Sequence, residues 1–175
     1  MARGIHPRRL YAARDAGTVL ELSRGVFRLP TLPCTEPDLL AVATRMPRAV
    51  FCLVTALHLH GLTQEIPRVV HVALPRGVRP ARLHHPPLEV YHLAAPSLDH
   101  GVETRVVDGM DLRVTSPARS VADAFRFRGR VGLETAIDAL KQALGRRAVT
   151  IAELDQMARV CRVQAVMRPY LEALG

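Results

Sequence analysis

The side chains best suited to bind a ligand lie near the start of the chain, and most of them are basic. Residues 1–30 hold six arginines against Asp15 and Glu21, which places a net charge of +4 of the chain's +8 in this segment. An arginine guanidinium offers several N–H donors in the geometry that phosphate oxygens accept. The residues expected to contact a phosphate-bearing ligand are His6, Arg8, Arg9, Tyr11, Arg14, Arg24 and Arg28.

The same segment has the pattern of a short helix followed by a hairpin. Pro7 suits a first helical turn, because its missing N–H would have no partner there, and Gly17 suits a helix end. Residues 18–22 and 26–29 predict two short strands, with Arg24 in the turn between them. A basic helix followed by such a hairpin is the order of the recognition helix and wing in a winged helix-turn-helix. We therefore expect this segment to bind double-stranded DNA.

The charge also has a simpler interpretation. Lys141 is the only lysine among 24 basic residues, and alanine, arginine and valine are abundant, as in proteins from GC-rich genomes. A basic helix and hairpin can also be a solvated surface element. Charge alone leaves both readings open, and the helix–hairpin order favours DNA binding.

Composition sets the class of protein. With 175 residues and 49% hydrophobic content, the chain can bury one main core and a small second unit. Cys34, Cys52 and Cys161 are odd in number and widely spaced, which favours reduced thiols over disulfides. No apolar leader follows Met1, and the apolar run 49–62 is interrupted by histidines and too short to span a bilayer. We expect a cytoplasmic protein with no membrane partner.

The organisation changes after residue 30. The proline-flanked residues 31–34 predict a linker, and Thr35 and Pro37 predict the capped start of a helix that ends near Met46. Residues 50–60 are apolar nearly all round and predict a buried helix. Strands are expected at residues 69–74, 88–93, 102–107 and 110–115, the last two joined by the hairpin signal Asp108-Gly109.

The last third predicts helices. Ser116 precedes a proline and predicts an N-cap, and Thr150-Ile151-Ala152-Glu153 predicts a capping box with Ile151 facing inward. An apolar stripe over residues 133–144 and a second over 163–174 predict two further amphipathic helices. The expected fold class is α+β, with a small mixed sheet and a helical C-terminal third.

Residues for metal or covalent chemistry form no convincing set. His58 and His60 are two apart on an expected helix, so their side chains diverge, whereas His71 and His92 lie on expected strands and can meet across a sheet. Packing is the commoner role for single histidines, and we expect no bound metal, no cofactor and no catalytic residue. The alternative is a metal-dependent nuclease, which would need the carboxylates of Glu89, Asp99, Asp108 and Asp111 to converge.

Three stretches, taken in order, resemble the AbiEi family, the antitoxins of type IV (abortive-infection) toxin–antitoxin pairs. They are residues 5–10 with 23–30, residues 55–62 (Thr-Ala-Leu-His-Leu-His-Gly-Leu) and residues 115–123 (Thr-Ser-Pro-Ala-Arg-Ser-Val-Ala-Asp). The resemblance implies a winged helix-turn-helix at residues 1–30, which represses its own operon, and an antitoxin domain at residues 31–175. It implies a nucleotidyltransferase-like toxin, encoded next door, as the functional partner. The alternative is a protein-interaction module that neutralises a toxin without DNA binding.

Read from the residues alone, the second and third stretches favour structural roles. Leu57 and its apolar neighbours are expected in the core, and Arg119 and Asp123 are expected to pair at i,i+4 spacing.

One feature departs from the family pattern. A winged helix-turn-helix has two scaffold helices before its recognition helix, and only four residues precede Ile5 here. Ile5, Leu10 and Leu20 would then lack their usual packing partners, unless the start lies upstream or the segment leans on the main domain or a second copy. We expect a monomer that pairs only on an inverted repeat, because one helix and wing make few contacts.

Overall fold

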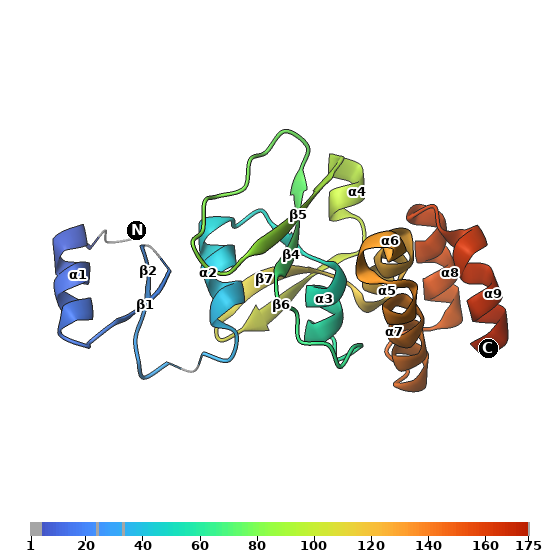
Figure 1. The fold of residues 1–175 in the computed structure, drawn as a ribbon, viewed down its shortest axis with the longest axis horizontal. Helices are drawn as coiled ribbons and strands as arrows, with labels where there is room; N and C mark the ends of the chain where they lie inside the picture. Colours follow the sequence, from blue (N-terminus) through green and yellow to red (C-terminus); the bar gives the residue numbers. More distant parts are fainter. Residues whose placement is uncertain (1–4, 24, 33, 175) are drawn as a thin grey trace.

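A computed structural model of the chain describes residues 5–23, 25–32 and 34–174. The molecule is elongated, with α1 and a hairpin at one end, a sheet with flanking helices in the middle, and a group of helices at the other end (Figure 1). The fold is mixed α+β, as the sequence predicts.

The first unit is a helix followed by an antiparallel hairpin. It consists of α1 (Pro7–Asp15), β1 (Leu20–Ser23) and β2 (Val26–Arg28). The helix is predicted correctly, with proline in its first turn and Gly17 after it at φ +71°. The first strand begins two residues later than predicted. The reason is that the amides of Thr18 and Val19 bond to the carbonyl of Ala13 and close the end of the helix instead.

The central sheet has five strands in the order β5-β4-β3-β7-β6. Neighbouring strands are parallel between β4 and β5 and between β3 and β7, and antiparallel between β3 and β4 and between β6 and β7. The bounds are β3 (Val50–Phe51), β4 (Val70–Pro75), β5 (Leu88–Leu93), β6 (Val102–Val107) and β7 (Met110–Thr115). The predicted hairpin joins β6 and β7 through Asp108 and Gly109, which have φ +50° and φ +80°.

Side chains alternate between the two faces of the sheet. One face carries Phe51, Val72 and Val114 in a core shared with α2 (Pro37–Arg45). The other face carries Val50, Ala73 and Tyr91 with the residues that open α3 (Leu53–Leu59). The sheet is therefore covered on both sides.

The predicted helix over residues 50–60 is wrong at its start. Val50 and Phe51 form the two-residue central strand β3, and α3 begins directly after Cys52. Leu53, the first residue of α3, takes φ +49°, in the left-handed region that residues other than glycine rarely adopt. A strand of two residues inside an apolar run has no period of its own, so the sequence could not separate it from the helix.

The start of α2 is held by a contact that the sequence does not indicate. Thr35 was expected to cap the helix, but Glu36 occupies the cap position and its side chain makes no cap hydrogen bond. The backbone N–H of Thr35 instead donates to Asp108 Oδ2 at 2.7 Å. The Asp108 carboxylate therefore ties the start of α2 to the turn between β6 and β7, rather than forming a turn bond within its own loop.

Helices form the last third of the chain, and the predicted caps are confirmed at Ser116 and Thr150. Their apolar faces form one core in which Val121, Leu140 and Met167 are fully buried. The helices after β5 are α4 (Ala95–Asp99), α5 (Pro117–Arg126), α6 (Arg128–Val131), α7 (Leu133–Gly145), α8 (Ile151–Val160) and α9 (Gln164–Leu174).

Three residues expected to face this core are instead well exposed. Leu133, Ile151 and Leu174 keep 39%, 46% and 40% of their surface. Each is the first or last residue of its helix, where no neighbouring turn covers it.

Candidate nucleic-acid interface

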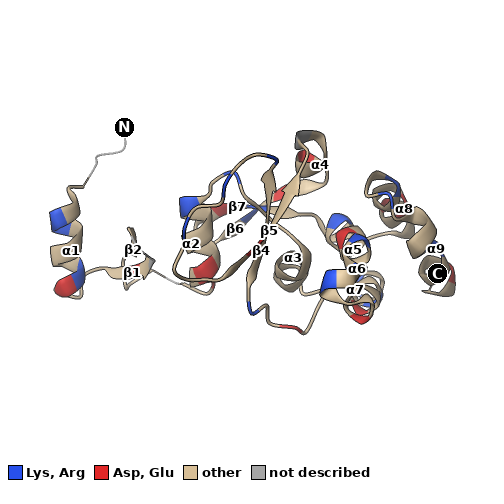
Figure 2. Ribbon diagram, turned by 45° about the horizontal axis from the view of Figure 1, so that its top comes forward, with Lys and Arg blue, Asp and Glu red and all other residues tan. Residues whose placement is uncertain are grey.

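The helix α1 contributes no buried residue to the fold. Leu10 and Ala13 are half-buried on one side, as their spacing predicts, and Arg8 and Arg9 are exposed in the first turn. His6 caps the helix, because its Nδ1 accepts the backbone N–H of Arg8 at 3.3 Å. Figure 2 shows basic residues on α1 and on α2, with the β1–β2 hairpin between the two helices. The helix is thus ordered by its cap and the hairpin while its basic side faces solvent.

An aromatic contact holds the hairpin against α1. The rings of Tyr11 and Phe27 meet edge to face with centroids 5.7 Å apart. The guanidinium of Arg14 lies 5.1 Å from the centre of the Tyr11 ring. Tyr11 still exposes 38% of its surface, so it both packs the hairpin and remains accessible to a ligand.

Two of the expected phosphate ligands are engaged within the protein. Arg14 pairs with Asp15 at 2.8 Å and with Glu21 at 2.9 Å, and hydrogen bonds to these carboxylates raise its pKa. Arg28 donates to the carbonyl oxygens of Leu29, Pro30 and Leu32, the last at 2.6 Å. Both arginines therefore shape the hairpin and its exit.

Arg24 lies outside the described residues. The expected set thus divides into Arg8, Arg9 and Tyr11, which are accessible, and His6, Arg14 and Arg28, which hold local structure.

The hairpin leans on the main domain through α2. Apolar residues of both line a pocket of about 330 Å³ that includes Leu22, Val26 and Leu40. Of the three apolar residues expected to lack packing partners, Ile5 and Leu20 keep 60% and 46% of their surface exposed, whereas Leu10 is half-buried. Of the arrangements considered from the sequence, the described residues show the one in which the hairpin rests on the main domain.

Sequence reasoning missed a second basic segment near this unit. The loop between β4 and β5 runs along the side of α2 that faces α1 (Figure 1). It carries Arg76, Arg79 and Arg82, all exposed, and His84 and His85. The sequence does show five arginine or histidine side chains within residues 76–85, but only the fold brings them close to α1.

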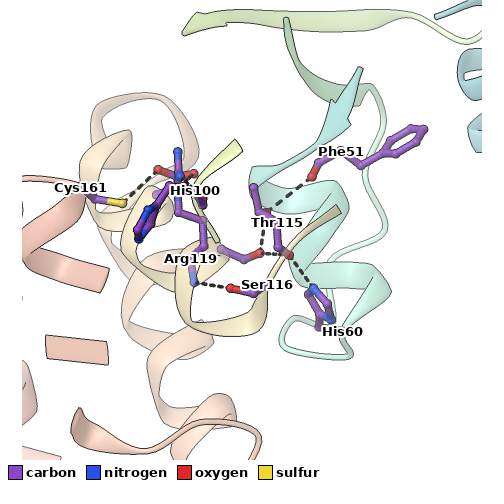
Figure 3. Close-up of polar contacts among 9 residues, drawn as sticks. Phe51, His60, His100, Thr115, Ser116, Arg119 and Cys161 are labelled. Atoms are coloured by element: carbon purple, nitrogen blue, oxygen red, sulfur yellow. Dashed lines mark hydrogen bonds and ion pairs between the residues drawn. The ribbon is translucent and has the colours of Figure 1, made fainter. Parts of the chain in front are cut away.

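Residues 55–62 and 115–123, two of the three stretches that resemble the AbiEi family, meet in a polar cluster between the sheet and the helices (Figure 3). The ring of His60 bonds through Nε2 to the carbonyl oxygen of Thr115 at 2.7 Å. The hydroxyl groups of Thr115 and Ser120 lie 2.7 Å apart, and Ser116 caps α5. Burial lowers the pKa of His60, and the Thr115 carbonyl opposes that shift. The ring is therefore favoured in its neutral form, with Nε2 as donor.

A buried ion pair stands beside this cluster (Figure 3). Arg119 Nε donates to Asp123 Oδ2 at 2.7 Å, and the two side chains are only 2% and 3% exposed. Arg119 Nη1 also donates to the carbonyl of His100 at 2.6 Å, and the Cys161 thiol lies 3.6 Å from the other Asp123 oxygen. Burial lowers the pKa of Arg119, but the charge and hydrogen bond of the Asp123 carboxylate, together with the nearby cysteines, outweigh burial, and the net pKa is raised. Burial also raises the pKa of Cys161 to about 12.

These contacts give the two stretches a structural role, the interpretation favoured from their residues. Thr115, Arg119, Ser120 and Asp123 are all buried, and Leu57 is fully buried. The stretches join the sheet to the helical third.

The strand histidines His71 and His92 do not pair across the sheet, so the possible meeting of their rings is not found. His71 lies beside Glu89 in the parallel register of β4 and β5, and His92 lies beside Leu74. The backbone N–H of His71 donates to the buried Thr55 hydroxyl at 2.9 Å, whereas the exposed His92 ring bonds to the carbonyl of Val78. Burial lowers the pKa of His71.

Three of the four carboxylates considered for a nuclease have separate partners. Asp99 pairs with Arg113, Glu89 accepts the hydroxyl of Tyr91, and Asp108 holds the start of α2. In the part of the chain that the structure describes, no group of three or more His, Cys, Asp or Glu side chains is placed to hold a metal ion. This set does not form the site that the nuclease alternative needs.

Comparison with known proteins leaves the family open. No protein-family model matches the chain, and no curated protein matches its sequence. Among the described residues, no helix has both the length and the apolar character needed to cross a membrane.

Proposed function

We propose that the chain binds double-stranded DNA through α1 and the β1–β2 hairpin, used as the recognition helix and wing of a winged helix-turn-helix. The observation that carries the proposal is a capped helix that buries no residue and exposes Arg8 and Arg9. A helix that adds little to the core and keeps a basic face needs another reason for its order and charge. Insertion into a DNA groove supplies one.

The charge distribution along α1 supports this proposal. Arg8 and Arg9 lie in the first turn, where the helix dipole is positive, and no acidic residue offsets them there. Two cations at this end are unfavourable in the free protein, and a phosphate group would relieve that repulsion. The helix has nine residues and is about 13–14 Å long, and its diameter of about 10–12 Å fits a major groove about 12 Å wide.

We propose further that the protein is the antitoxin of a type IV toxin–antitoxin pair. It would repress its own operon and counteract a nucleotidyltransferase-like toxin in the cytoplasm. The support is the resemblance of three stretches to the AbiEi antitoxins, in the same order along the chain. Two of these stretches build the junction around His60 and Arg119, so antitoxin activity would reside on the surface that this junction supports.

The alternative is toxin neutralisation by protein contact without DNA binding. The size of the body favours it, since most of the chain builds three apolar cores away from α1. One full-length variant, Arg8→Ala with Arg9→Ala, distinguishes DNA binding from neutralisation by protein contact.

Two assays in the same cells test the proposal, with the chain expressed beside the neighbouring gene and beside a reporter driven by its own upstream region. We expect R8A/R9A to lose repression of the reporter. A matched control, Arg68→Ala with Lys141→Ala, removes the same charge from two other exposed sites and should keep repression. Repression by R8A/R9A equal to the wild type would contradict DNA recognition by α1. Rescue of growth by R8A/R9A would place neutralisation in the body, whereas loss of rescue would make repression the antitoxin mechanism.

A further inference from the structure

A cleft separates the N-terminal unit from the loop of residues 76–87. It encloses about 840 Å³ and is lined by Tyr11 and Gly25 on one side. Arg45 of α2, Arg82 and His84 line it on the other side, together with several prolines of the loop. The cleft therefore runs directly beside the proposed DNA-binding helix and has a basic outer wall.

The loop is fixed to the body at several points, so its basic side chains have defined positions. The backbone N–H of Ala81 donates to the sulfur of Met46 at 3.3 Å, and the His92 ring bonds to the carbonyl of Val78 at 3.0 Å. His85 Nε2 lies 3.2 Å from an oxygen of Asp38. A loop held in this way can present charges without first being ordered by a ligand.

Arg45 and Arg82 line the cleft, Arg76 and Arg79 belong to the same loop as Arg82, and no ion pair among the described residues neutralises them. Arg45, Arg76, Arg79 and Arg82 are exposed, and none of them takes part in the ion pairs found among the described residues. By contrast, the exposed Arg159 and Arg168 each have a carboxylate oxygen at hydrogen-bond distance, 2.6 Å and 2.7 Å away. The cleft wall thus keeps its positive charge available to an anionic ligand.

We propose that Arg45 and the loop of residues 76–87 bind the phosphate backbone of the DNA duplex that α1 enters, so that one strand of this duplex lies in the cleft. The inference rests on the proposed function and extends it to the main domain. Unpaired guanidinium groups beside a recognition helix are the kind of donor that contacts phosphate oxygens and fixes a protein's position on a duplex. Among the described residues that line the cleft, Tyr11 is the only Phe, Tyr or Trp, so few rings are offered for stacking of unpaired bases and a duplex is favoured over a single strand.

In this arrangement the main domain, as well as α1, contacts DNA. A split into a DNA-binding segment at residues 1–30 and an antitoxin body at residues 31–175 would give the body no part in DNA binding. In the proposed arrangement the body supplies sequence-independent contacts, while α1 supplies the contacts to base edges. Affinity for any duplex then depends on the loop, and preference for the operator depends on α1.

The test compares Arg79→Ala with Arg82→Ala against the control Arg68→Ala with Lys141→Ala. Both double variants remove two exposed positive charges, and melting curves check that both remain folded. Binding is measured for the full-length chain with a duplex from its own upstream region and with a random duplex of equal length, over a range of salt concentrations. We expect R79A/R82A to weaken binding to both duplexes about ten-fold, or about 1.4 kcal/mol. The slope of log K against log salt should fall by about two units, and the control should leave both quantities unchanged.

The results distinguish a failure of this inference from a failure of the proposed function. If R79A/R82A binds with the wild-type affinity and slope while R8A/R9A does not bind the upstream duplex, the cleft wall is not a phosphate site and the proposed function stands. Equal losses in R79A/R82A and in the control would show a general charge effect and would also overturn the inference. A wild-type chain that binds neither duplex would contradict the proposed function itself.

Discussion

The buried pair of Arg119 and Asp123 gives a stability prediction that can be worked from the structure. Asp123→Asn keeps the size of the side chain but removes its charge, and leaves the Arg119 guanidinium 2% exposed without a counter-ion. Breaking a buried ion pair in this way costs about 3–5 kcal/mol, because the remaining charge cannot return to water. A chain of this size has a total free energy of unfolding of about 5–15 kcal/mol, so the variant should lose a large part of it.

Urea unfolding measures this loss. With a dependence of about 2 kcal/mol per molar urea, the midpoint should fall by about 2 M. The pair of Arg168 and Glu172 is a matched control, since it has the same i,i+4 spacing and the same 2.7 Å distance but is 75% and 64% exposed. Glu172→Gln should change the free energy of unfolding by less than about 1 kcal/mol.

A second variant separates burial of charge from loss of packing. Replacing both partners, Arg119→Met with Asp123→Leu, removes the stranded charge and should recover most of the stability lost in Asp123→Asn. The reasoning would be refuted if Asp123→Asn were no more destabilising than Glu172→Gln. It would also be refuted if the double replacement were less stable than the single one.

Three further predictions follow from other sites. Gly101→Ala should destabilise the protein by about 1–3 kcal/mol more than Gly109→Ala in thermal unfolding. Both glycines have positive φ, but only at Gly101 would a Cβ lie 3.0 Å from Met157, whereas nothing lies within 4 Å of it at Gly109. Burial lowers the pKa of both His60 and His71, so the folded state favours the neutral rings. Their contribution to the free energy of unfolding is complete above the ordinary pKa of 6.5. It should be lost as pH falls from 6.5 through the lowered values. A urea midpoint that does not decrease as the pH is lowered from 7.5 to about 5 would contradict this prediction. Light scattering should find a monomer in free solution, with pairing only on operator DNA; a stable dimer without DNA would show this expectation wrong.

Local signals in the sequence predicted the fold where a few adjacent residues determine the backbone. Asp108-Gly109 fixed the strands on both sides of its turn with correct bounds, and the caps at Ser116 and Thr150 were correct. The short elements were missed for a physical reason. A strand as short as β3 or a helix as short as α4 shows no period, and its existence depends on tertiary contacts.

The sequence predicted which residue types form the candidate site, but not which of these side chains are exposed and which are paired within the protein. The charge of Arg8 and Arg14 is equally visible in the sequence, yet the hairpin brings Glu21 against Arg14 and leaves Arg8 exposed. The same holds for Asp108, whose partner Thr35 is 73 positions away. The basic wall of residues 76–87 became part of the site only through its place beside α2, since nothing in a linear sequence relates it to α1.

DNA binding by α1 is the central claim, and fluorescence anisotropy with a labelled duplex from the chain's own upstream region tests it most directly. The account predicts that the wild-type chain prefers this duplex over a random one, and that the affinity falls steeply with salt. It predicts that R8A/R9A loses the preference and that R68A/K141A retains it. Binding of the upstream duplex by R8A/R9A with wild-type affinity and preference, or no salt-dependent binding by the wild-type chain, would contradict the account.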